Sequence, residues 1–164
     1  MSRAEDKTAI LLGYLVLAFQ DLEANLLFLL TGLFEKTDSE LARVLACQLP
    51  YRKLLNILDA LFRKKIRQRD ILERFQKIVS ECSRLEEKRN TYIHSHYHFM
   101  DIVGSDTRIH RTKERVRRYR GYDLLMEEYD SDELDKVLES AYAVMDQINE
   151  LISDLEERGI ASYF

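Results

Sequence analysis

The segment 86–95, EEKRNTYIHS, holds the residue types in this chain that are best suited to catalysis. On a helix, Asn90 and His94 are four residues apart and share one face, and Glu86 lies one turn earlier on that face. Arg89 and His94 are five residues apart, so their side chains project about 140° apart around the helix axis. The spacing predicts a cluster of Glu86, Asn90 and His94, flanked by Arg89, at the C-terminal end of a helix.

These residue types fit the cleavage of RNA by its own 2′-hydroxyl group. That reaction needs a group that moves a proton near neutral pH, and histidine is the natural one. It also needs fixed positive charge at the phosphate, which arginine supplies through two donors. We expect His94 to act as general acid/base, Arg89 to stabilise phosphate charge and Asn90 to orient one of them. No metal or other cofactor is expected, because the nucleophile belongs to the substrate.

The run 89–94, Arg-Asn-Thr-Tyr-Ile-His, resembles the Arg-Asn-x-x-x-His motif of HEPN domains, a superfamily of helical proteins. The setting of the motif is similar as well. A Phe-x-x-Leu-Glu segment, at Phe19, Leu22 and Glu23, lies in the first long apolar stretch. An acidic lead-in precedes the motif, and an amphipathic segment ends the chain. The resemblance covers most of the chain.

This resemblance implies a helical bundle and a homodimer, in which two motifs face each other and form one composite site. It implies metal-independent endoribonuclease activity, often in toxin–antitoxin or other antiviral systems that include a partner protein. Arg89 and His94 then carry over as the catalytic pair, and Asn90 as a supporting residue. HepT-like toxins place a tyrosine two residues after the histidine, where a nucleotidyltransferase modifies it. Here His96 stands there and Tyr97 follows, which argues against such an antitoxin.

Residues around the motif are expected to support it or to bind RNA. Glu86 and Glu23 are the candidate supporting carboxylates. Arg89 can instead form a structural ion pair with Glu86, and Glu23 can be an exposed charge. His96 and Tyr97 directly follow the motif, and we expect them to contact the substrate; the alternative for Tyr97 is packing at the helix end.

A basic run extends from Arg108 to Arg120. It holds seven basic residues and one acid, Glu114, in a chain whose formal net charge is -4. Such a run is either a solvated surface or an arm that follows the phosphates of single-stranded RNA. The candidate substrate-binding residues within it are Arg111, Arg115, Arg117 and Arg118.

The histidines also raise a metal alternative. His94, His96 and His98 alternate along the chain, and His110 can lie across a hairpin from them. Three imidazoles can hold zinc or copper. The spacing is not a recognised zinc pattern and no cysteine joins it, so we expect no metal site.

The elements that must position these residues are mostly helices. Helical periods of apolar residues predict helices over about Glu5–Phe34, Glu40–Cys47, Tyr51–Arg67, Asp70–His94 and Asp130–Gly159. Residues 95–120 show alternation and a Gly-Ser-Asp turn instead, which predicts a β-hairpin or a long basic loop. We expect one domain over residues 1–164: an all-α, HEPN-like bundle of four to five helices with this insertion before the last helix.

Local signals refine three of these helices. The first helix is apolar on nearly all sides, so it must be buried on nearly all sides, which suggests a subunit interface as well as a core. Asp130-Ser131 followed by Glu133 predicts a capping box at the start of the last helix. Gly159 predicts its end.

Composition narrows the class of protein. Apolar residues make up 46% and charged residues 33%, which excludes a disordered chain. The N-terminal apolar run is interrupted by Gln20, Asp21 and Glu23, so we expect no membrane span. Cys47 and Cys82 lie in apolar-periodic segments and are expected to be buried free thiols in a reducing compartment. We therefore expect a cytoplasmic protein.

Two other functions compete with RNA cleavage. The first alternative is a non-catalytic helical module that binds RNA or a partner protein through the same groove. A four-helix metal protein is a weaker alternative, because it needs paired Glu-x-x-His motifs on two helices and the sequence has none.

Overall fold

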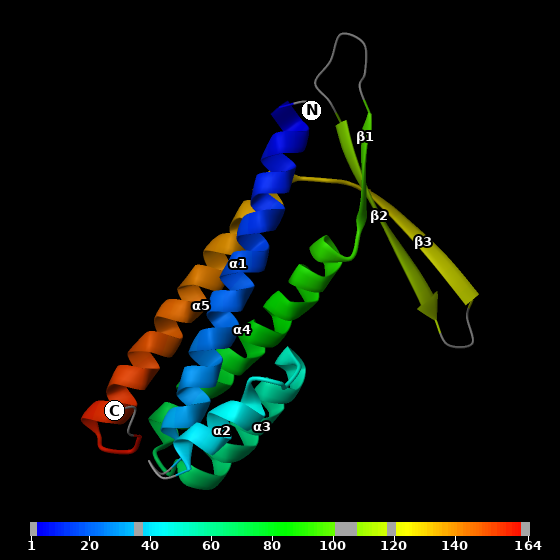
Figure 1. Ribbon diagram of the computed structural model, residues 1–164. Helices are drawn as coiled ribbons and strands as arrows, with labels where there is room; N and C mark the ends of the chain where they lie inside the picture. Colours follow the sequence, from blue (N-terminus) through cyan, green and yellow to red (C-terminus); the bar gives the residue numbers. More distant parts are fainter. Residues whose placement is uncertain (1–2, 35–37, 101–107, 118–120, 162–164) are drawn as a thin grey trace. The chain divides into compact units, whose positions relative to one another are not determined.

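The computed structural model describes residues 3–34, 38–100, 108–117 and 121–161 (Figure 1). The elements, in chain order, are α1 (Arg3–Gly32), α2 (Ser39–Ala46), α3 (Tyr51–Lys65), α4 (Arg69–Ile93), β1 (His96–Met100), β2 (Arg108–Arg117), β3 (Gly121–Glu128) and α5 (Ser131–Glu157). This order confirms a mostly helical chain with an insertion before the last helix.

The insertion is larger than the sequence predicts. We expected it to end near residue 120, but the structure adds a third strand, β3, as far as Glu128. The strands form one antiparallel sheet in the order β1-β2-β3, with β2 in the middle. Leu124, Leu125 and Met126 are three consecutive exposed apolar residues of β3. Because they do not alternate with polar residues, this stretch lacked the two-residue period that marks a half-buried strand.

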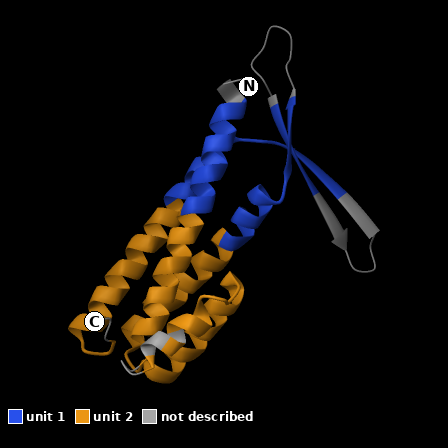
Figure 2. Ribbon diagram, viewed as in Figure 1, with its two compact units in different colours: residues 1–17, 86–139 blue, residues 18–85, 140–164 orange. Residues whose placement is uncertain are grey.

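The chain divides into two compact units, coloured separately in Figure 2. The first unit comprises Met1–Leu17 and Glu86–Glu139, and so contains the motif and the sheet. The second comprises Ala18–Leu85 and Ser140–Phe164.

The second unit has a dense core of apolar side chains from four helices. Residues with no exposed surface in this core are Ala18, Leu22, Leu26, Leu29, Leu58, Phe62, Ile71, Cys82, Ala141, Ile148, Leu151 and Leu155. The rings of Phe62 and Phe75 stack with centroids 3.6 Å apart and planes 6° apart. Burial of this kind is the main source of stability of a helical unit.

The ends of α5 follow local signals in the sequence. The side chain of Asp130 accepts a hydrogen bond from the Asp132 amide at 2.8 Å, so Asp130 caps the first turn. At the other end Gly159 has φ 64°, and the Ile160 amide donates to the carbonyl of Leu155 at 2.9 Å. This is a Schellman motif, and it confirms the predicted stop at Gly159.

The predicted capping box at α5 is wrong. Glu133 accepts a hydrogen bond from the ammonium of Lys88 at 2.6 Å. A tertiary ion pair with α4 therefore engages the carboxylate that the box would need.

Helix α1 is less covered by its own chain than its composition predicts. Ile10, Tyr14 and Leu17 lie on one stripe and are 51–56% exposed. Among the residues that the structure describes, Glu5–Gly32 is the only helical stretch long and apolar enough to cross a membrane by length and composition. Among the described residues, none covers this stripe, so the expected burial on nearly all sides is not found there.

The two cysteines differ, and the prediction that both are buried is wrong for Cys47. Cys47 follows α2 with an exposed side chain, whereas Cys82 of α4 has no exposed surface. Burial raises the pKa of the Cys82 thiol to about 11. Helix α2 exposes leucines as well, at Leu41 and Leu45. In so short a helix, the spacing of apolar residues therefore does not distinguish buried positions from exposed ones.

This difference predicts selective thiol chemistry. In the native protein, an aromatic disulfide reagent at pH 8 should modify Cys47 rapidly and leave Cys82 unmodified, because only a thiolate attacks and Cys82 is buried as the thiol. Both should react once the protein is unfolded. Titration of the released chromophore, with Cys47→Ser as the control, checks this; rapid native reaction of the Cys47→Ser variant would contradict the burial of Cys82.

Candidate functional site

The predicted motif lies at the C-terminal end of α4. Arg89 and Asn90 belong to the last turns, Ile93 is the final helical residue, and His94 follows in the turn toward β1 (Figure 1). The Arg89 Nη1 atom donates a hydrogen bond to the Asn90 Oδ1 atom at 3.1 Å. Both side chains are half-buried, whereas His94 is exposed. The structure thus brings Arg89 and Asn90 together and leaves the His94 imidazole open to solvent.

The sheet caps this end of α4. The last carbonyls of a helix have no partner within it, and α4 has no basic residue in its last turn. Three side chains of the sheet donate to three consecutive carbonyls: Tyr97 Oη to Tyr92 O at 2.9 Å, Arg111 Nη1 to Thr91 O at 3.3 Å, and Lys113 Nζ to Asn90 O at 3.1 Å. Two of these donors are cations, which the negative end of the helix dipole favours.

Arg111 was predicted to bind substrate, but the structure gives it a structural setting. Its side chain is only 9% exposed and forms an ion pair with Glu127, its cross-strand partner on β3. Its guanidinium also lies 5.1 Å from the centroid of the Tyr92 ring. These contacts engage the guanidinium within the protein, and a role for Arg111 in binding phosphate stays a prediction.

Tyr97 is also engaged within the protein. Its ring meets the Tyr129 ring edge to face at 5.4 Å, and its hydroxyl donates to α4 as described above. Burial raises the pKa of Tyr97 and of Tyr92, so both phenols stay protonated donors near neutral pH. Tyr97 therefore packs the sheet onto the helix end, and its contact with substrate stays a prediction.

The three histidines of the strands share the other face of the sheet. Register pairs His98 with His110 and His96 with Thr112, one residue out of phase with Tyr97 and Arg111. The His98 Nε2 atom lies 3.0 Å from the Thr112 hydroxyl oxygen. Within the described part of the chain, no three His, Cys, Asp or Glu side chains form a group that could hold a metal ion.

The remaining predicted residues are Arg115, Arg117, Arg118, Glu86 and Glu23. Arg115 and Arg117 lie in β2 with side chains outside the described set, and Arg118 lies outside the described residues altogether. Glu86 is half-buried on α4, one turn before Asn90. Glu23 is an exposed residue of α1 and belongs to the second unit.

Sequence reasoning missed Lys113, Glu127, Lys88 and Glu133. The first two complete the cap of α4, and the last two join α4 to the start of α5. The missing basic residue in the last turn of α4 was the available signal, because uncapped carbonyls require donors from elsewhere. The register of the strands decides which side chains donate to these carbonyls, and the sequence alone did not determine that register.

The Lys88–Glu133 pair predicts a pH dependence of stability. The hydrogen bond from Lys88, with one from Tyr92, holds the pKa of the Glu133 carboxyl below its usual value, against the opposing effect of burial. A depressed pKa stabilises the fold above the unfolded-state value near 4.5, and this contribution is lost as pH falls through the folded-state value. The pair is half-exposed, so the effect is below about 1 kcal/mol.

Melting temperatures between pH 3 and 6 check this prediction. Glu133→Gln should flatten the loss of stability toward low pH, and Glu139→Gln, which changes an exposed acid of the same helix, should not. Parallel melting curves for wild type and Glu133→Gln across this range would contradict the contribution of the pair.

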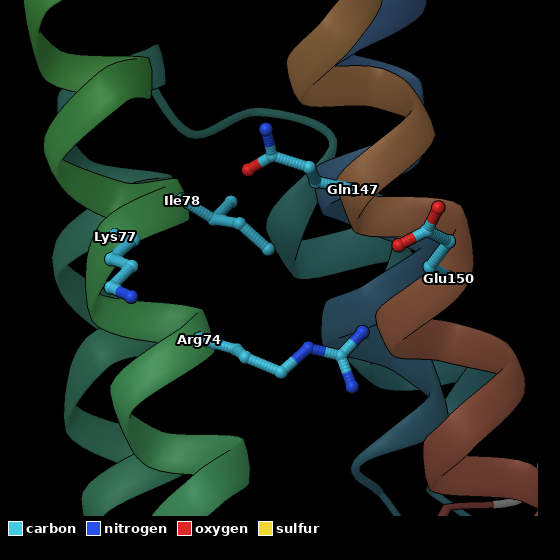
Figure 3. A pocket seen from close by; sticks show the side chains of 5 residues that line it. All are labelled: Arg74, Lys77, Ile78, Gln147 and Glu150. Carbon is cyan, nitrogen blue, oxygen red and sulfur yellow. The ribbon is translucent and has the colours of Figure 1, made fainter.

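A separate surface depression lies in the second unit. It has a volume of about 210 Å³ and is lined by Arg74, Lys77, Ile78, Gln147 and Glu150 (Figure 3). Arg74 reaches from α4 toward α5 and donates to Asp154 at 2.7 Å. None of the residues predicted to act on RNA lines this depression.

The geometry defines a class of structure: a mostly helical chain whose three-stranded antiparallel sheet caps the helix that carries an Arg-Asn-x-x-x-His motif. No known family model, curated protein or solved structure matches the chain. The HEPN resemblance therefore rests on the motif and its setting.

Proposed function

We propose that this protein is a metal-independent endoribonuclease of the HEPN type, with Arg89, Asn90 and His94 as its catalytic residues. The observation that carries this proposal is the end of α4. There Arg89 donates to Asn90, and an exposed histidine follows one turn later. A cation and a general acid/base at one site are the two functions that cleavage by a 2′-hydroxyl requires.

In this proposal the 2′-oxygen of the RNA attacks the adjacent phosphorus, and the bond to the 5′-oxygen breaks. The proton of the 2′-hydroxyl is taken up and a proton is delivered to the leaving 5′-oxygen, both through His94. Arg89 stabilises charge on the non-bridging oxygens. Asn90 orients Arg89, because its Oδ1 atom accepts the Nη1 hydrogen bond. The products are a 2′,3′-cyclic phosphate and a 5′-hydroxyl.

We further propose a homodimer with a composite site, and a toxin or antiviral-defence role with a partner protein such as an antitoxin. The exposed stripe of Ile10, Tyr14 and Leu17 on α1 supports an association, because large contiguous apolar surface is unusual on a monomer. A location in the cytoplasm is also a proposal. The two free thiols support it, since reducing compartments keep cysteines unpaired.

A second candidate is a non-catalytic module that binds a partner protein. The exposed Leu124, Leu125 and Met126 on the edge strand β3 favour it, because an open apolar edge can pair with another chain. This reading does not need an intact His94, which separates the two candidates by experiment.

The test uses purified protein and total cellular RNA in excess EDTA, followed by electrophoresis. We expect the wild type to cut RNA and to leave single-stranded DNA intact, since DNA lacks the 2′-hydroxyl. His94→Ala should leave both intact. Intact RNA with the wild type would favour the binding module, and equal cleavage by His94→Ala would show that the activity does not come from this site.

A further inference from the structure

We infer that Arg111 is a positioning residue for the proposed reaction, acting through the last turn of α4 on His94. The inference rests on the proposed function and deepens it. In this inference, a side chain of the sheet holds the proposed catalytic histidine in position.

The contacts of Arg111 tie three segments together. Its Nη1 atom lies 3.3 Å from the Thr91 carbonyl oxygen and 3.4 Å from the Ser95 hydroxyl, which belong to α4 and to the α4–β1 turn. Its Nη2 atom pairs with Glu127 of β3. A guanidinium has a rigid fork of five donors, so one side chain can hold several acceptors in a fixed geometry.

His94 stands between the two residues that Arg111 holds. Thr91 precedes it and Ser95 follows it, and the Ser95 hydroxyl donates to the Thr91 carbonyl. The His94 amide donates to the Asn90 carbonyl at 3.3 Å. In the described part of the chain, no side chain hydrogen-bonds or ion-pairs with the His94 imidazole. The position of the imidazole therefore follows from its backbone, and Arg111 contacts the residues on both sides of that backbone, at the Thr91 carbonyl and the Ser95 hydroxyl.

Arg111 makes more contacts, and is more deeply buried, than capping of a helix requires. Lys113 and Tyr97 already donate to the neighbouring carbonyls. Placing a guanidinium that is only 9% exposed at this point carries a desolvation cost, which Glu127 and the Tyr92 ring offset. A second cap by a surface lysine would satisfy the carbonyl without that cost. The bridge to Ser95, beyond the helix, is the contact that capping does not explain.

The test compares Arg111→Gln and Arg111→Lys with wild type on a labelled single-stranded RNA that contains a site mapped with total RNA. Because misplacement of a catalytic group lowers the rate of chemistry, kcat should fall about 10- to 100-fold for Arg111→Gln, with KM nearly unchanged. Arg111→Lys should recover part of the loss, since it keeps the charge and loses the fork. Arg74→Gln, which breaks an ion pair in the second unit, should keep the wild-type kcat.

Hydrogen exchange of the His94 amide supplies a readout that does not depend on activity. We expect faster exchange at His94 in Arg111→Gln and Glu127→Gln, with unchanged exchange in the core of the second unit. Wild-type kcat in Arg111→Gln, or unchanged exchange at His94, would overturn the inference. Absence of cleavage by the wild type would instead overturn the proposed function. If Arg111→Gln does not fold, Arg111→Lys and Glu127→Gln carry the same comparison.

Discussion

Replacing His94 by alanine is expected to lower the rate of RNA cleavage about 10²- to 10⁴-fold, the usual contribution of a positioned general acid/base. The imidazole is exposed, so the change should leave the fold intact. His110→Ala is the matched control, because it removes an imidazole from the face of the sheet that does not cap α4. Initial rates in EDTA, with circular dichroism to check folding, measure the effect.

Arg89→Ala should cause a loss of similar size, and the double variant should be hardly slower than either single one. Residues that act together in one step show such non-additive losses. Arg89→Lys should recover little, because an ammonium cannot reproduce the planar two-donor contact with a phosphate. Fully multiplicative losses would mean that the two residues act in separate steps, contrary to the mechanism proposed here.

Replacing Phe62 by alanine is expected to lower the free energy of unfolding by about 3–5 kcal/mol, the usual cost of removing a buried aromatic ring. Phe62 has no exposed surface and stacks on Phe75, so its removal leaves a cavity and an unpaired ring face. Urea unfolding followed by circular dichroism measures the change. Leu45→Ala is the control, because Leu45 is 63% exposed and surface changes usually stay within about 0.5 kcal/mol.

The Phe75→Ala variant tests the stacking itself. The loss in the Phe62→Ala/Phe75→Ala double variant should be smaller than the sum of the single losses, because contacting residues couple. Additive losses would indicate that the two rings are stabilised by separate neighbours.

The helices were predictable because their apolar residues recur with the helical period over long stretches. The boundaries of α4 and α5 agree with the predicted ones to within a residue or two, and Gly159 marked its helix end by its conformation. These signals are local, so they can be read from neighbouring residues alone.

Strand β3 and the exposure of Cys47 were not predictable in the same way. The run Leu124–Met126 is apolar without alternation, and it becomes a strand because β2 offers it a partner. Cys47 lies beside buried Ala46, and only the packing of α2 decides which of the two faces inward. Both features depend on tertiary contacts that no local period records.

The candidate site also combines features set by local sequence with features set by tertiary contacts. The sequence predicted that Arg89, Asn90 and His94 lie at the end of one helix; the structure places Arg89 and Asn90 in the last turns of α4 and His94 in the turn just beyond it. It did not predict that Arg111 would lie against that helix end, because the basic run resembles a surface arm in composition. The register of β2 with β1 and β3 places Arg111 on the face of the sheet that contacts α4.

Attack by the 2′-hydroxyl distinguishes this mechanism from other routes of RNA cleavage, and a single 2′-deoxy substitution in the substrate removes that group. A synthetic RNA is prepared with and without the 2′-hydroxyl at the mapped scissile position, and each is incubated with wild-type protein in EDTA. We predict cleavage of the unmodified RNA to a 2′,3′-cyclic phosphate end and no cleavage of the substituted RNA at that position. Cleavage of both, or products that end in a 3′-hydroxyl, would contradict the account.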